Sequence, residues 1–462
     1  MNENTMKTER VNRVLIAGTG SGCGKTTVAM ALLQAFKNRG IGVSAAKCGP
    51  DYIDPMFHRS VIGAPSCNLD SFFFDENTLR FLLARHGANR DITVIEGVMG
   101  YYDGLGLTST RASAYEIASL TETPVILVVN ARGASLSILA QIQGFLSFAE
   151  NSRIKGVILN NCTEKVYLAL KPEIEERFGI RALGCLPRMK EAEIGSRHLG
   201  LITAEEVDDL KEKLELLSSQ AEKSLDLDGI IELAYRAEPL RFLPEEIGKK
   251  EPVRIAVAMD KAFCFYYEDS LSMLADMGAE LMPFSPIEDA ALPSGIHGLY
   301  LGGGYPELYA AELSENHSMR ESIKTAVGSG LPTIAECGGF MYLTESIGAL
   351  PAVGAIKGKA FDSGRLTRFG YVSLSAKTDN MLCKAGERIP AHEFHHWDAE
   401  NCGSSFTAEK ADGRSWDCVH AGETLYAGFP HFHFYANKGF AENFYNACLK
   451  RKNGEKKDDR NT

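Results

Sequence analysis

The 462-residue chain lacks the features of a membrane protein or of a secreted, disulfide-bonded one. No apolar run reaches the roughly 18 residues that a membrane-spanning helix requires. The first ten residues hold no apolar stretch, so a secretory signal is not expected. The eleven cysteines are odd in number and none forms a C-x-x-C pair, which is typical of reduced thiols. We therefore expect a cytoplasmic protein that does not associate with a membrane.

The chain also lacks an excess of positive charge. Lysine and arginine number 49 against 60 aspartates and glutamates, which leaves a formal net charge of −11. This balance argues against a nucleic-acid or anionic membrane partner, although a local basic pocket remains compatible with it. The 45% hydrophobic and 24% charged residues are typical of soluble globular proteins. The length is too great for a single core and predicts two or three domains.

Short apolar runs alternate with helical patterns through the first half of the chain. The runs are continuous rather than alternating, which is typical of buried parallel strands. They are Val14–Ala17, Ile92–Ile95, Pro124–Val129 and Gly156–Leu159. Helical segments such as Ser135–Phe148 lie between them. This order predicts a doubly wound α/β domain over residues 11–240.

The second half repeats the α/β pattern after a break. Residues 203–237 carry a charged, amphipathic helical pattern, and a stretch rich in proline and charge follows them. We expect a linker at 241–252 and a second doubly wound domain at 253–449. The polar tail 450–462 is expected to be disordered.

A glycine-rich loop, Gly18-Thr-Gly-Ser-Gly-Cys-Gly-Lys-Thr-Thr27, joins the first apolar run to a helical pattern at 28–36. Such a loop presents backbone N–H groups and a helix N-terminus to an anion. Lys25 would reach the outer phosphates of a nucleotide, and the Thr26 hydroxyl would bind Mg²⁺. The spacing G-x-x-x-x-x-G-K-T is one residue longer than usual and resembles the dethiobiotin-synthetase branch of P-loop proteins. The predicted nucleotide-binding residues are Gly18, Gly22, Gly24, Lys25, Thr26 and Thr27.

Acidic and amide side chains follow other predicted strands, at the edge where α/β sheets bind ligands. Asp51 and Asp54 lie in a loop after the strand-breaking Gly49-Pro50. Glu96 ends an apolar run and Asp103 follows close behind it, which favours a Mg²⁺ or substrate role over a structural one. Asn160 also ends a strand, where it would either hydrogen-bond a base or cap the strand.

A nucleophile turn is predicted in Leu331-Pro-Thr-Ile-Ala-Glu-Cys-Gly-Gly-Phe-Met-Tyr-Leu343, which has the pattern strand, tight turn, helix. Cys337 would be held exposed at this turn, whereas the other cysteines, including Cys67, Cys264 and Cys402, are interpreted as buried small hydrophobes. The glycine loop Leu301–Glu307 follows another strand, and its N–H groups could bind an oxyanion during acyl transfer.

Two histidines near the C-terminus are candidate bases for Cys337. They lie in Gly428-Phe-Pro-His-Phe-His-Phe434, where alternation puts His431 and His433 on one face of a strand. A thiol nucleophile needs such a base. No acidic residue lies two positions after His431.

The segment His392-Glu-Phe-His-His396 satisfies H-E-x-x-H, the pattern of zinc metallopeptidases. That chemistry requires a helix, whereas the preceding proline and the aromatic neighbours favour an extended segment. A structural or substrate-side role is the preferred interpretation.

Several motifs in order resemble the cobyrinic acid a,c-diamide synthase family, the glutamine-dependent amidases of cobalamin biosynthesis. They are Gly18–Thr27, Lys47–Asp54, Glu96–Gly104, Arg197–Leu201, Phe263–Glu268 and Phe284–Pro286. The second half resembles class I-type glutamine amidotransferases of the cobyric-acid-synthase branch, in which a histidine partners the cysteine. By position in that motif the resemblance favours His431 over His433, and the family's third triad member is not evident. The resemblance covers nearly all of residues 11–445. It implies a dethiobiotin-synthetase-like P-loop NTPase domain that binds ATP and Mg²⁺, followed by a glutamine amidotransferase domain.

The resemblance also implies roles for individual residues. Lys25 and Lys47 would contact phosphate, and Thr26, Asp51 and Glu96 would surround the metal. The residues expected to hold or activate the corrinoid carboxylate are Tyr52, Asp54 and Asp103. Cobyrinic acid, ATP and L-glutamine are the implied substrates, with amidation of the a and c side chains through acyl phosphates.

Other functions remain open at this point. Related enzymes amidate hydrogenobyrinic acid or nickel sirohydrochlorin, and cobyric acid synthase shares both domain types. A P-loop switch ATPase belongs to a different class, which has no use for a nucleophile turn. The run Pro50–Asp54 and the aromatic segment 265–267 favour the a,c-diamide enzyme over cobyric acid synthase. The oligomeric state cannot be inferred from the sequence.

Overall fold

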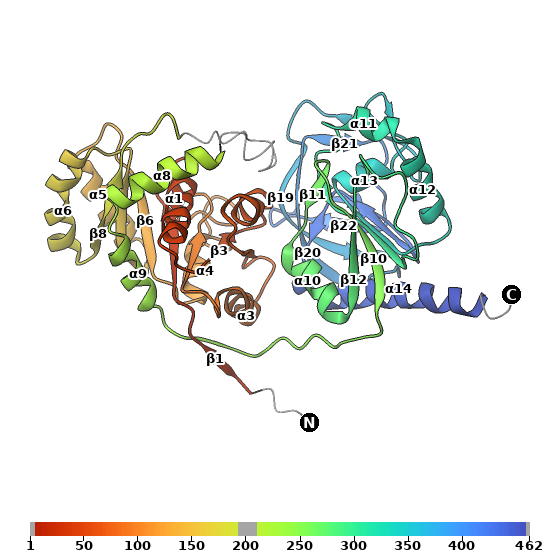
Figure 1. Cartoon of the computed structure of the whole chain (residues 1–462), viewed down its shortest axis with the longest axis horizontal. Coiled ribbons are helices and arrows are strands. Elements are labelled where there is room, and N and C mark those ends of the chain that lie inside the picture. Colours follow the sequence, from red (N-terminus) through yellow and green to blue (C-terminus); the bar gives the residue numbers. More distant parts are fainter. Residues whose placement is uncertain (1–4, 193–209, 459–462) are drawn as a thin grey trace. The chain divides into compact units, whose positions relative to one another are not determined.

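The computed structural model describes residues 5–192 and 210–458. The chain divides into two compact units, Met1–Glu245 and Glu246–Thr462. Each is an α/β fold with its own apolar core (Figure 1). The predicted motif Arg197–Leu201 lies outside the described residues.

A seven-stranded sheet with the order β4-β3-β5-β2-β6-β7-β8 forms the centre of the N-terminal unit. In chain order its strands are β2 (Arg13–Gly18), β3 (Val43–Cys48), β4 (Ser66–Leu69), β5 (Ile92–Glu96), β6 (Val125–Asn130), β7 (Ile154–Asn160) and β8 (Arg181–Leu186). All neighbours pair in parallel. Both faces of a parallel sheet are covered, which explains the continuous apolar runs. The four predicted strands are confirmed.

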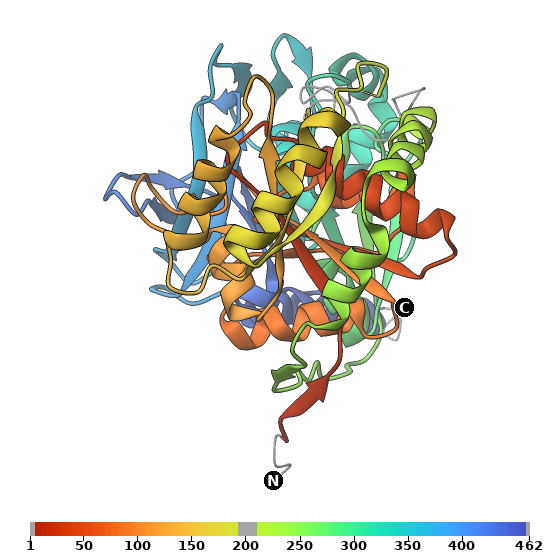
Figure 2. The ribbon, with the colours of Figure 1, turned by 90° about the vertical axis from the view of Figure 1, so that its left-hand side faces the viewer.

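Helices connect these strands and cover the sheet (Figure 2). They are α1 (Lys25–Asn38), α2 (Ile53–Phe57), the π-helical turn η1 (His58–Ile62), α3 (Glu76–Gly87), α4 (Ala114–Leu120), α5 (Ser137–Ser147), α6 (Glu164–Phe178), α8 (Leu210–Ser224) and α9 (Leu227–Tyr235). One core cluster joins apolar residues of α1, α8 and α9 to the sheet. The helical pattern expected at 203–237 thus forms two helices over its described part.

The N-terminal unit extends into the stretch that was expected to be linker. Strand β9 (Leu240–Phe242) pairs antiparallel with β1 (Lys7–Glu9). Leu240 and Phe242 are buried, which explains why this proline-flanked stretch is ordered with the unit. The division between the units falls after Glu245.

A six-stranded sheet with the order β12-β10-β13-β15-β25-β24 forms the centre of the C-terminal unit. Its strands are β10 (Val253–Ala258), β12 (Ala279–Phe284), β13 (Gly298–Leu301), β15 (Thr333–Glu336), β24 (His420–Ala421) and β25 (Leu425–Gly428). Only β24 pairs antiparallel; the other neighbours are parallel. Two doubly wound units were predicted, and both units are α/β folds with a largely parallel sheet.

Smaller sheets surround this centre. A five-stranded antiparallel sheet contains β19 (Arg368–Ala376), β20 (Arg388–His395), β22 (Phe406–Glu409), β23 (Ser415–Cys418) and β26 (His431–Phe432). The others contain β11 (Phe263–Phe265) with β14 (Gly303–Gly304), and β16 (Ser346–Ile347), β17 (Leu350–Pro351), β18 (Lys359–Asp362) with β21 (Trp397–Ala399). The helices are α10 (Glu268–Met277), α11 (Ala310–Glu315), α12 (His317–Gly328), α13 (Gly338–Leu343), the 3₁₀ turn η3 (Phe434–Ala436) and α14 (Lys438–Asp458).

The C-terminal tail differs from expectation. Helix α14 continues to Asp458, so the prediction of disorder is wrong for residues 450–458. Arg451 donates to the backbone oxygen of Ser329, and Lys452 pairs with Glu251. Lysine and glutamate are good helix formers, so a polar composition alone did not distinguish an exposed helix from a disordered tail.

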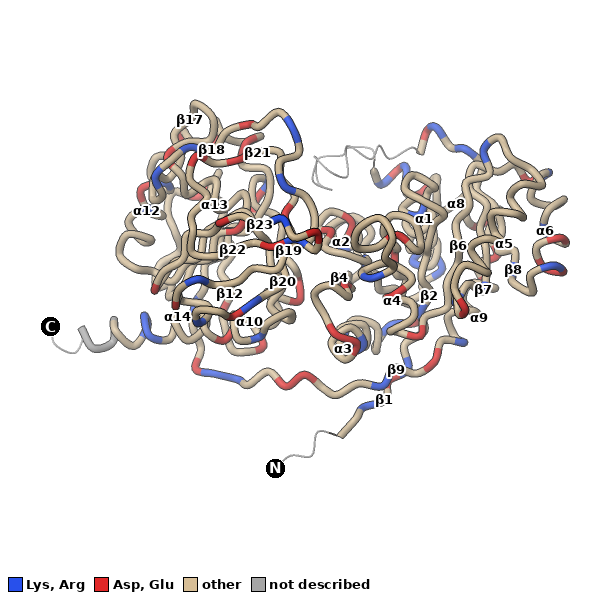
Figure 3. Tube along the Cα trace, turned by 180° about the vertical axis from the view of Figure 1, so that it is seen from behind, with Lys and Arg blue, Asp and Glu red and all other residues tan. Residues whose placement is uncertain are grey.

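The distribution of charged residues and the state of the cysteines in the structure can be compared with the expectations from composition. Acidic and basic residues are interspersed in both units (Figure 3). All eleven cysteines lie in the described residues and are free. Cys67 is buried as expected, but Cys264 and Cys402 are only half-buried. No helix in the described part of the chain is long and apolar enough to cross a membrane.

Candidate functional site

The phosphate loop lies between the end of β2 and the start of α1, in the predicted strand–loop–helix order. Gly22 and Gly24 have φ angles of +73° and +102°, which only glycine adopts without strain. A Cβ atom on Gly18 would lie 2.2 Å from the Cys23 sulfur, so the loop folds back tightly on the strand end. The Nζ of Lys25 donates to the backbone oxygens of Gly20, at 3.0 Å, and of Met99.

Asn160 supports this loop from the end of β7. Its Nδ2 donates to the backbone oxygen of Cys23 at 2.9 Å. A Cβ atom on Gly24 would lie 1.9 Å from the same Nδ2, so the amide packs directly against the loop. In this structure the Asn160 amide holds the phosphate loop. This role is closer to the predicted capping of the strand end than to a hydrogen bond with a base.

A buried charge cluster lies beside the loop, where β3 and β5 run next to each other with Lys47 opposite Glu96. The Glu96 Oε1 atom accepts hydrogen bonds from the Thr26 hydroxyl at 2.5 Å and from the Lys47 ammonium at 2.7 Å. Lys47 also forms an ion pair with Asp54. Contacts between residues 7 to 70 positions apart in the sequence therefore form one network.

The charges of this cluster stabilise each other. Burial disfavours the charged form of Lys47, but Asp54 and Glu96 offset this and hold its pKa well above the usual value. Burial likewise disfavours the charged form of Glu96, yet Lys47 and His58 bring its pKa below the usual value. His58 is fully buried, with Nε2 3.7 Å from the Glu96 Oε2 atom and Nδ1 3.1 Å from the Ser66 hydroxyl. Sequence reasoning missed His58, because one histidine in a short helical turn carries no distinguishing pattern.

The oxygen atoms of the cluster fit a magnesium ion. Glu96 Oε2 is buried and has no hydrogen-bond partner among the described residues. The Thr26 hydroxyl lies beside the same carboxylate. Oxygen ligands from one or two side chains, completed by water and phosphate, are what Mg²⁺ prefers.

The remaining predicted residues of this unit order their own loops. Asp51 Oδ1 accepts from the backbone N–H of Ile53 at 2.8 Å, at the start of α2, and half-buried Tyr52 precedes that helix. Asp103 Oδ2 accepts from the N–H of Gly100 at 2.8 Å. These contacts hold the loops after β3 and β5 at the carboxyl edge of the sheet, which contains the charge cluster.

The nucleophile turn of the C-terminal unit connects β15 to α13, as predicted. Cys337 has a φ of +47°, a strained angle for a residue with a side chain. Its N–H donates to the Gly428 oxygen at 2.8 Å, which ties the turn to β25. A Cβ on Gly339 would lie 2.2 Å from the Leu301 oxygen, so the chain can pass here only without a side chain.

Cys337 is buried, with 7% of its surface exposed, so the prediction of an exposed nucleophile is wrong. The glycine loop after β13 covers the turn: a Cβ on Gly338 would lie 2.8 Å from the Pro306 side chain and 3.1 Å from the Gly304 nitrogen. Burial, with a contribution from Glu307, raises the pKa of the Cys337 thiol. The resting group is therefore a thiol and requires a base.

His431 lies against the same glycine loop. A Cβ atom on Gly303 would lie 2.5 Å from the His431 Cε1 atom, so the missing side chain makes room for the imidazole. Burial lowers the pKa of His431 to about 3, which leaves the imidazole neutral at rest. The loop thus contacts both the nucleophile turn and the histidine.

His433 is placed differently, beyond the end of β26. Its Nδ1 accepts from the N–H of Tyr435 at 3.1 Å and caps η3, and its ring packs against Tyr267 at 4.8 Å between centroids. Burial lowers its pKa to about 4. These contacts favour His431 as the partner of Cys337.

The glycine loop has fewer available N–H groups than expected. The N–H of Gly302 donates to the Tyr266 hydroxyl at 2.8 Å, and the oxygen of Gly302 accepts from Gly339. The N–H of Tyr305 also donates, to the Ala262 oxygen at 3.0 Å, so any oxyanion contact from this loop has to come from its other amides.

Glu336 is a buried residue of this site that sequence reasoning did not single out. It directly precedes Cys337, and its carboxyl accepts from the Tyr300 hydroxyl at 2.8 Å and from the Phe432 N–H at 3.1 Å. Burial raises its pKa to about 7. The signal was available, since a glutamate ending an apolar strand is unusual.

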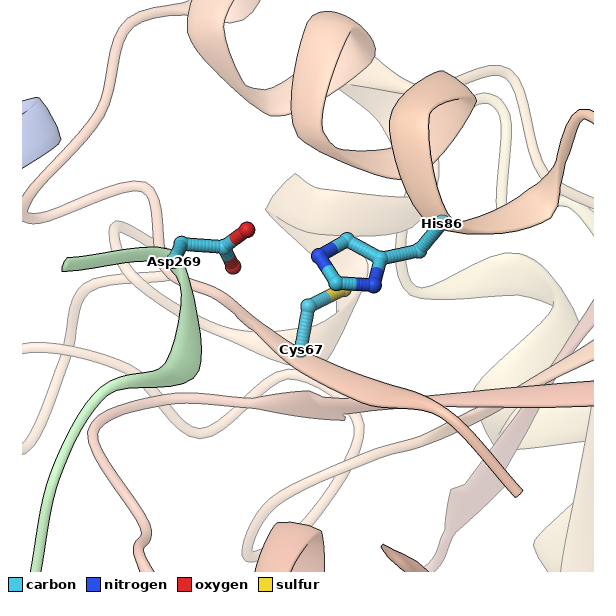
Figure 4. Close-up of side chains that lie close together, drawn as sticks. All are labelled: Cys67, His86 and Asp269. Atoms are coloured by element: carbon cyan, nitrogen blue, oxygen red, sulfur yellow. The ribbon is translucent and has the colours of Figure 1, made fainter. Parts of the chain in front are cut away.

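Two other groups contain side chains of the kinds that bind metal ions. All of the H-E-x-x-H segment except its last residue, His396, lies on strand β20, which confirms the prediction of an extended conformation. His392 is paired with His431 across the strands. Figure 4 shows Cys67 and His86, both in the N-terminal unit, together with Asp269. Asp269 belongs to the C-terminal unit, so neither unit by itself supplies the three residues.

Family comparisons agree with this two-site arrangement. Residues 14–202 match the CobQ/CobB/MinD/ParA nucleotide binding domain, and residues 254–439 match the CobB/CobQ-like glutamine amidotransferase domain. The first segment contains the phosphate loop and the charge cluster, and the second contains the nucleophile turn and both histidines.

Similar proteins match this chain over nearly its whole length. A cobyrinate a,c-diamide synthase of Caldanaerobacter subterraneus subsp. tengcongensis is 40% identical over 443 residues, which cover 94% of this chain and 98% of that protein. Enzymes of the same name from Listeria innocua and Listeria monocytogenes are each 39% identical, over 95% and 92% of this chain and 99% and 97% of those proteins. With both domains and nearly the full length matched, the chain belongs to the cobyrinate a,c-diamide synthase family.

Proposed function

We propose that this chain catalyses the ATP- and glutamine-dependent amidation of the a and c carboxylates of cobyrinic acid in cobalamin biosynthesis. The observation that carries the proposal is the match to cobyrinate a,c-diamide synthases over nearly the full chain. The presence of a phosphate loop in one unit and a cysteine turn in the other supports it, because such an enzyme needs one site for activation and one for ammonia release.

The C-terminal unit would release ammonia from glutamine. His431 takes the thiol proton as the Cys337 sulfur attacks the amide carbon, and the proton then leaves with the ammonia. A glutamyl thioester remains and is hydrolysed by water to glutamate. The glycine loop, which contacts both the nucleophile turn and His431, supports these roles.

The N-terminal unit would activate the carboxylate. The substrate oxygen attacks the γ-phosphorus of ATP, ADP leaves, and ammonia then displaces phosphate from the acyl phosphate to form the amide. Lys25, Lys47 and the N–H groups of Gly22 and Gly24 would hold the phosphates and stabilise the developing charge. Gly18, Thr27 and Asn160 would shape and support the loop.

The residues proposed to hold magnesium are Thr26, Glu96 and Asp51. When bound, Mg²⁺ neutralises phosphate charge in phosphoryl transfer. Glu96 is ionised beside Lys47, as a metal-binding carboxylate must be. Lys47 balances its charge in the cluster.

The proposed corrinoid contacts are Tyr52, Asp54 and Asp103. Asp54 pairs with Lys47 and so connects the substrate loop to the phosphate-binding lysine. Free cysteines support the proposed cytoplasmic location.

The test is to incubate the purified protein with ATP, Mg²⁺, cobyrinic acid and either glutamine or ammonia, and to analyse the corrinoid by mass spectrometry. Two successive exchanges of a hydroxyl for an amino group are expected with either nitrogen source. ATP turnover without any change in cobyrinic acid would overturn the substrate assignment, and nickel sirohydrochlorin would then be tested as acceptor. ATP turnover that needs neither nitrogen source nor acceptor would support a switch ATPase instead.

A further inference from the structure

The sequence offers no acid two residues after His431, yet the structure holds a buried carboxyl beside the cysteine. We propose that Glu336 is a positioning residue of the glutaminase reaction, whose carboxyl fixes the nucleophile turn, the glycine loop and the histidine strand relative to one another. The inference rests on the proposed function, because it assigns the third side chain of the same site.

Three strands meet at this carboxyl. Glu336 is the last residue of β15, and the turn at Cys337 begins directly after it. One carboxyl oxygen accepts from the N–H of Phe432, the residue after His431 on β26, at 3.1 Å. The other accepts from the hydroxyl of Tyr300 on β13 at 2.8 Å.

Each hydrogen bond reaches a chain segment next to a reacting group. Tyr300 lies on β13 directly before the glycine loop Leu301–Glu307. Phe432 and His431 share a two-residue strand, so the bond to the Phe432 N–H limits movement of the histidine backbone. A strained residue such as Cys337 persists only when its surroundings over-determine it, and Glu336 supplies this constraint from the strand side.

The groups that hold Glu336 are buried and aligned. Glu336 and Tyr300 each have 2% of their surface exposed, so water does not compete for these bonds. Tyr300 is itself packed against Tyr266 at 5.3 Å between centroids, and the Tyr266 hydroxyl accepts from the N–H of Gly302. The carboxyl therefore belongs to a network that also anchors the first glycine of the loop.

The test compares two substitutions of Glu336. Glu336→Ala removes both acceptors, whereas Glu336→Gln keeps an oxygen for the Phe432 N–H and lets the Tyr300 hydroxyl rotate to accept from the amide. We expect Glu336→Ala to lower kcat for glutamate release by about 10²-fold, because a displacement of about 1 Å at a reacting group has this effect. We expect Glu336→Gln to restore kcat to within about threefold, since the geometry is kept. KM for glutamine and the rate of ammonia-dependent amidation should stay close to wild type in both.

Tyr300→Phe and Tyr445→Phe form a matched pair that keeps the fold. Each loses one hydroxyl of a buried tyrosine in the same unit, but the Tyr445 hydroxyl donates to the Glu251 backbone oxygen rather than to Glu336. We expect Tyr300→Phe to lower kcat for glutamate release about five- to tenfold, as loss of one hydrogen bond predicts. Tyr445→Phe should leave it unchanged.

The outcomes separate the inference from the function on which it rests. Unchanged glutamate release in Glu336→Ala, or equal losses in Tyr300→Phe and Tyr445→Phe, would overturn the positioning role alone. A Glu336→Gln variant as impaired as Glu336→Ala would overturn it too, because a negative charge and not hydrogen-bond geometry would then be required. If the wild-type protein itself releases no glutamate from glutamine, the proposed function fails and the inference fails with it.

Discussion

The phosphate loop after β2 and the nucleophile turn after β15 both occupy the carboxyl end of a parallel strand, where the chain turns into a helix. Both use positive φ angles, at Gly22 and Gly24 in one and at Cys337 in the other. Both are held by a residue from another strand, since Asn160 supports the first and Gly428 the second. The phosphate loop and the nucleophile turn therefore share the same kind of backbone geometry.

The electrostatic surroundings of the two sites differ. Beside the phosphate loop, Lys47, Asp54 and Glu96 are buried together and keep Lys47 and Glu96 ionised. Beside the nucleophile turn, burial dominates: it raises the pKa of Cys337 and lowers that of His431, so both groups rest in their neutral forms.

The difference follows from the partners that each group has. A buried charge persists only where an opposite charge lies within a few ångströms, as in the first site. Phosphate and metal binding require such fixed charges, whereas a thiol–imidazole pair can create its charges during the reaction by moving one proton. The same strand-to-helix turn thus serves two kinds of chemistry.

Replacing the nucleophile should separate the two sites most strongly. Cys337→Ala is expected to reduce glutamine-dependent amidation by about 10³-fold or more, since a covalent nucleophile is lost. Ammonia-dependent amidation should remain, because the phosphate site is intact. Measurement of amide formation with each nitrogen source checks this. Cys448→Ala, which alters another buried thiol of the same unit, is the control and should keep both activities; loss of both in Cys337→Ala would contradict the separation.

Removing the central cation of the charge cluster should destabilise the N-terminal unit. Lys47→Met leaves the buried Glu96 carboxylate without its cation, which is expected to cost about 3–5 kcal/mol of unfolding free energy. Denaturant unfolding followed by circular dichroism measures this, and amidation should fail with both nitrogen sources.

The matched control for this prediction is Arg177→Met. It breaks an ion pair with Glu173 on the surface of α6, where both side chains are largely exposed. Exposed pairs contribute little, so the unfolding curve should not move detectably. An equal shift of the unfolding curve for both variants would show that the stabilising effect of Lys47 does not depend on burial of its cluster.

The nucleophile should show the pH dependence of a neutral thiol. Because burial raises the pKa of Cys337, less thiolate is present at any given pH than in a free thiol of pKa about 8.5. Alkylation of Cys337 by iodoacetamide, followed by peptide mass spectrometry, should be about tenfold or more slower than that of a model thiol at pH 7 and still be rising at pH 9. His431 is neutral above pH 3 or so, so no inflection is expected between pH 5 and 8. A plateau below pH 7 would instead indicate a thiolate–imidazolium pair.

The smallest expected effect concerns the support of the phosphate loop. Asn160→Ala removes one buried hydrogen bond to the Cys23 oxygen, which is worth about 1 kcal/mol, and KM for ATP should rise several-fold. Glutamate release should not change. The neighbouring Asn161→Ala, whose amide donates to Asn130 on the exposed surface, should leave KM for ATP unchanged. If both variants behave alike, Asn160 does not act through the loop.

The local elements were predictable because their signals are local. Continuous apolar runs identify the strands β2, β5, β6 and β7, and glycines at fixed spacing identify the phosphate loop. The extended conformation of the H-E-x-x-H segment was also predictable, from a proline and aromatic neighbours. Polar composition was a poor guide in two places, at β9 and in α14, where long-range pairing and salt bridges order the chain.

The sequence by itself determined the family, the two kinds of site and the order in which they occur, because each motif needs only neighbouring residues and a strand–turn–helix context. The tertiary structure alone decided which side chains meet: His58 behind Glu96, Asn160 under the phosphate loop, and Glu336 between Tyr300 and Phe432. It also decided that Cys337 is buried and neutral at rest. These contacts join residues far apart in the chain, and burial is a property of the packed fold, so no pattern of neighbouring residues encodes them.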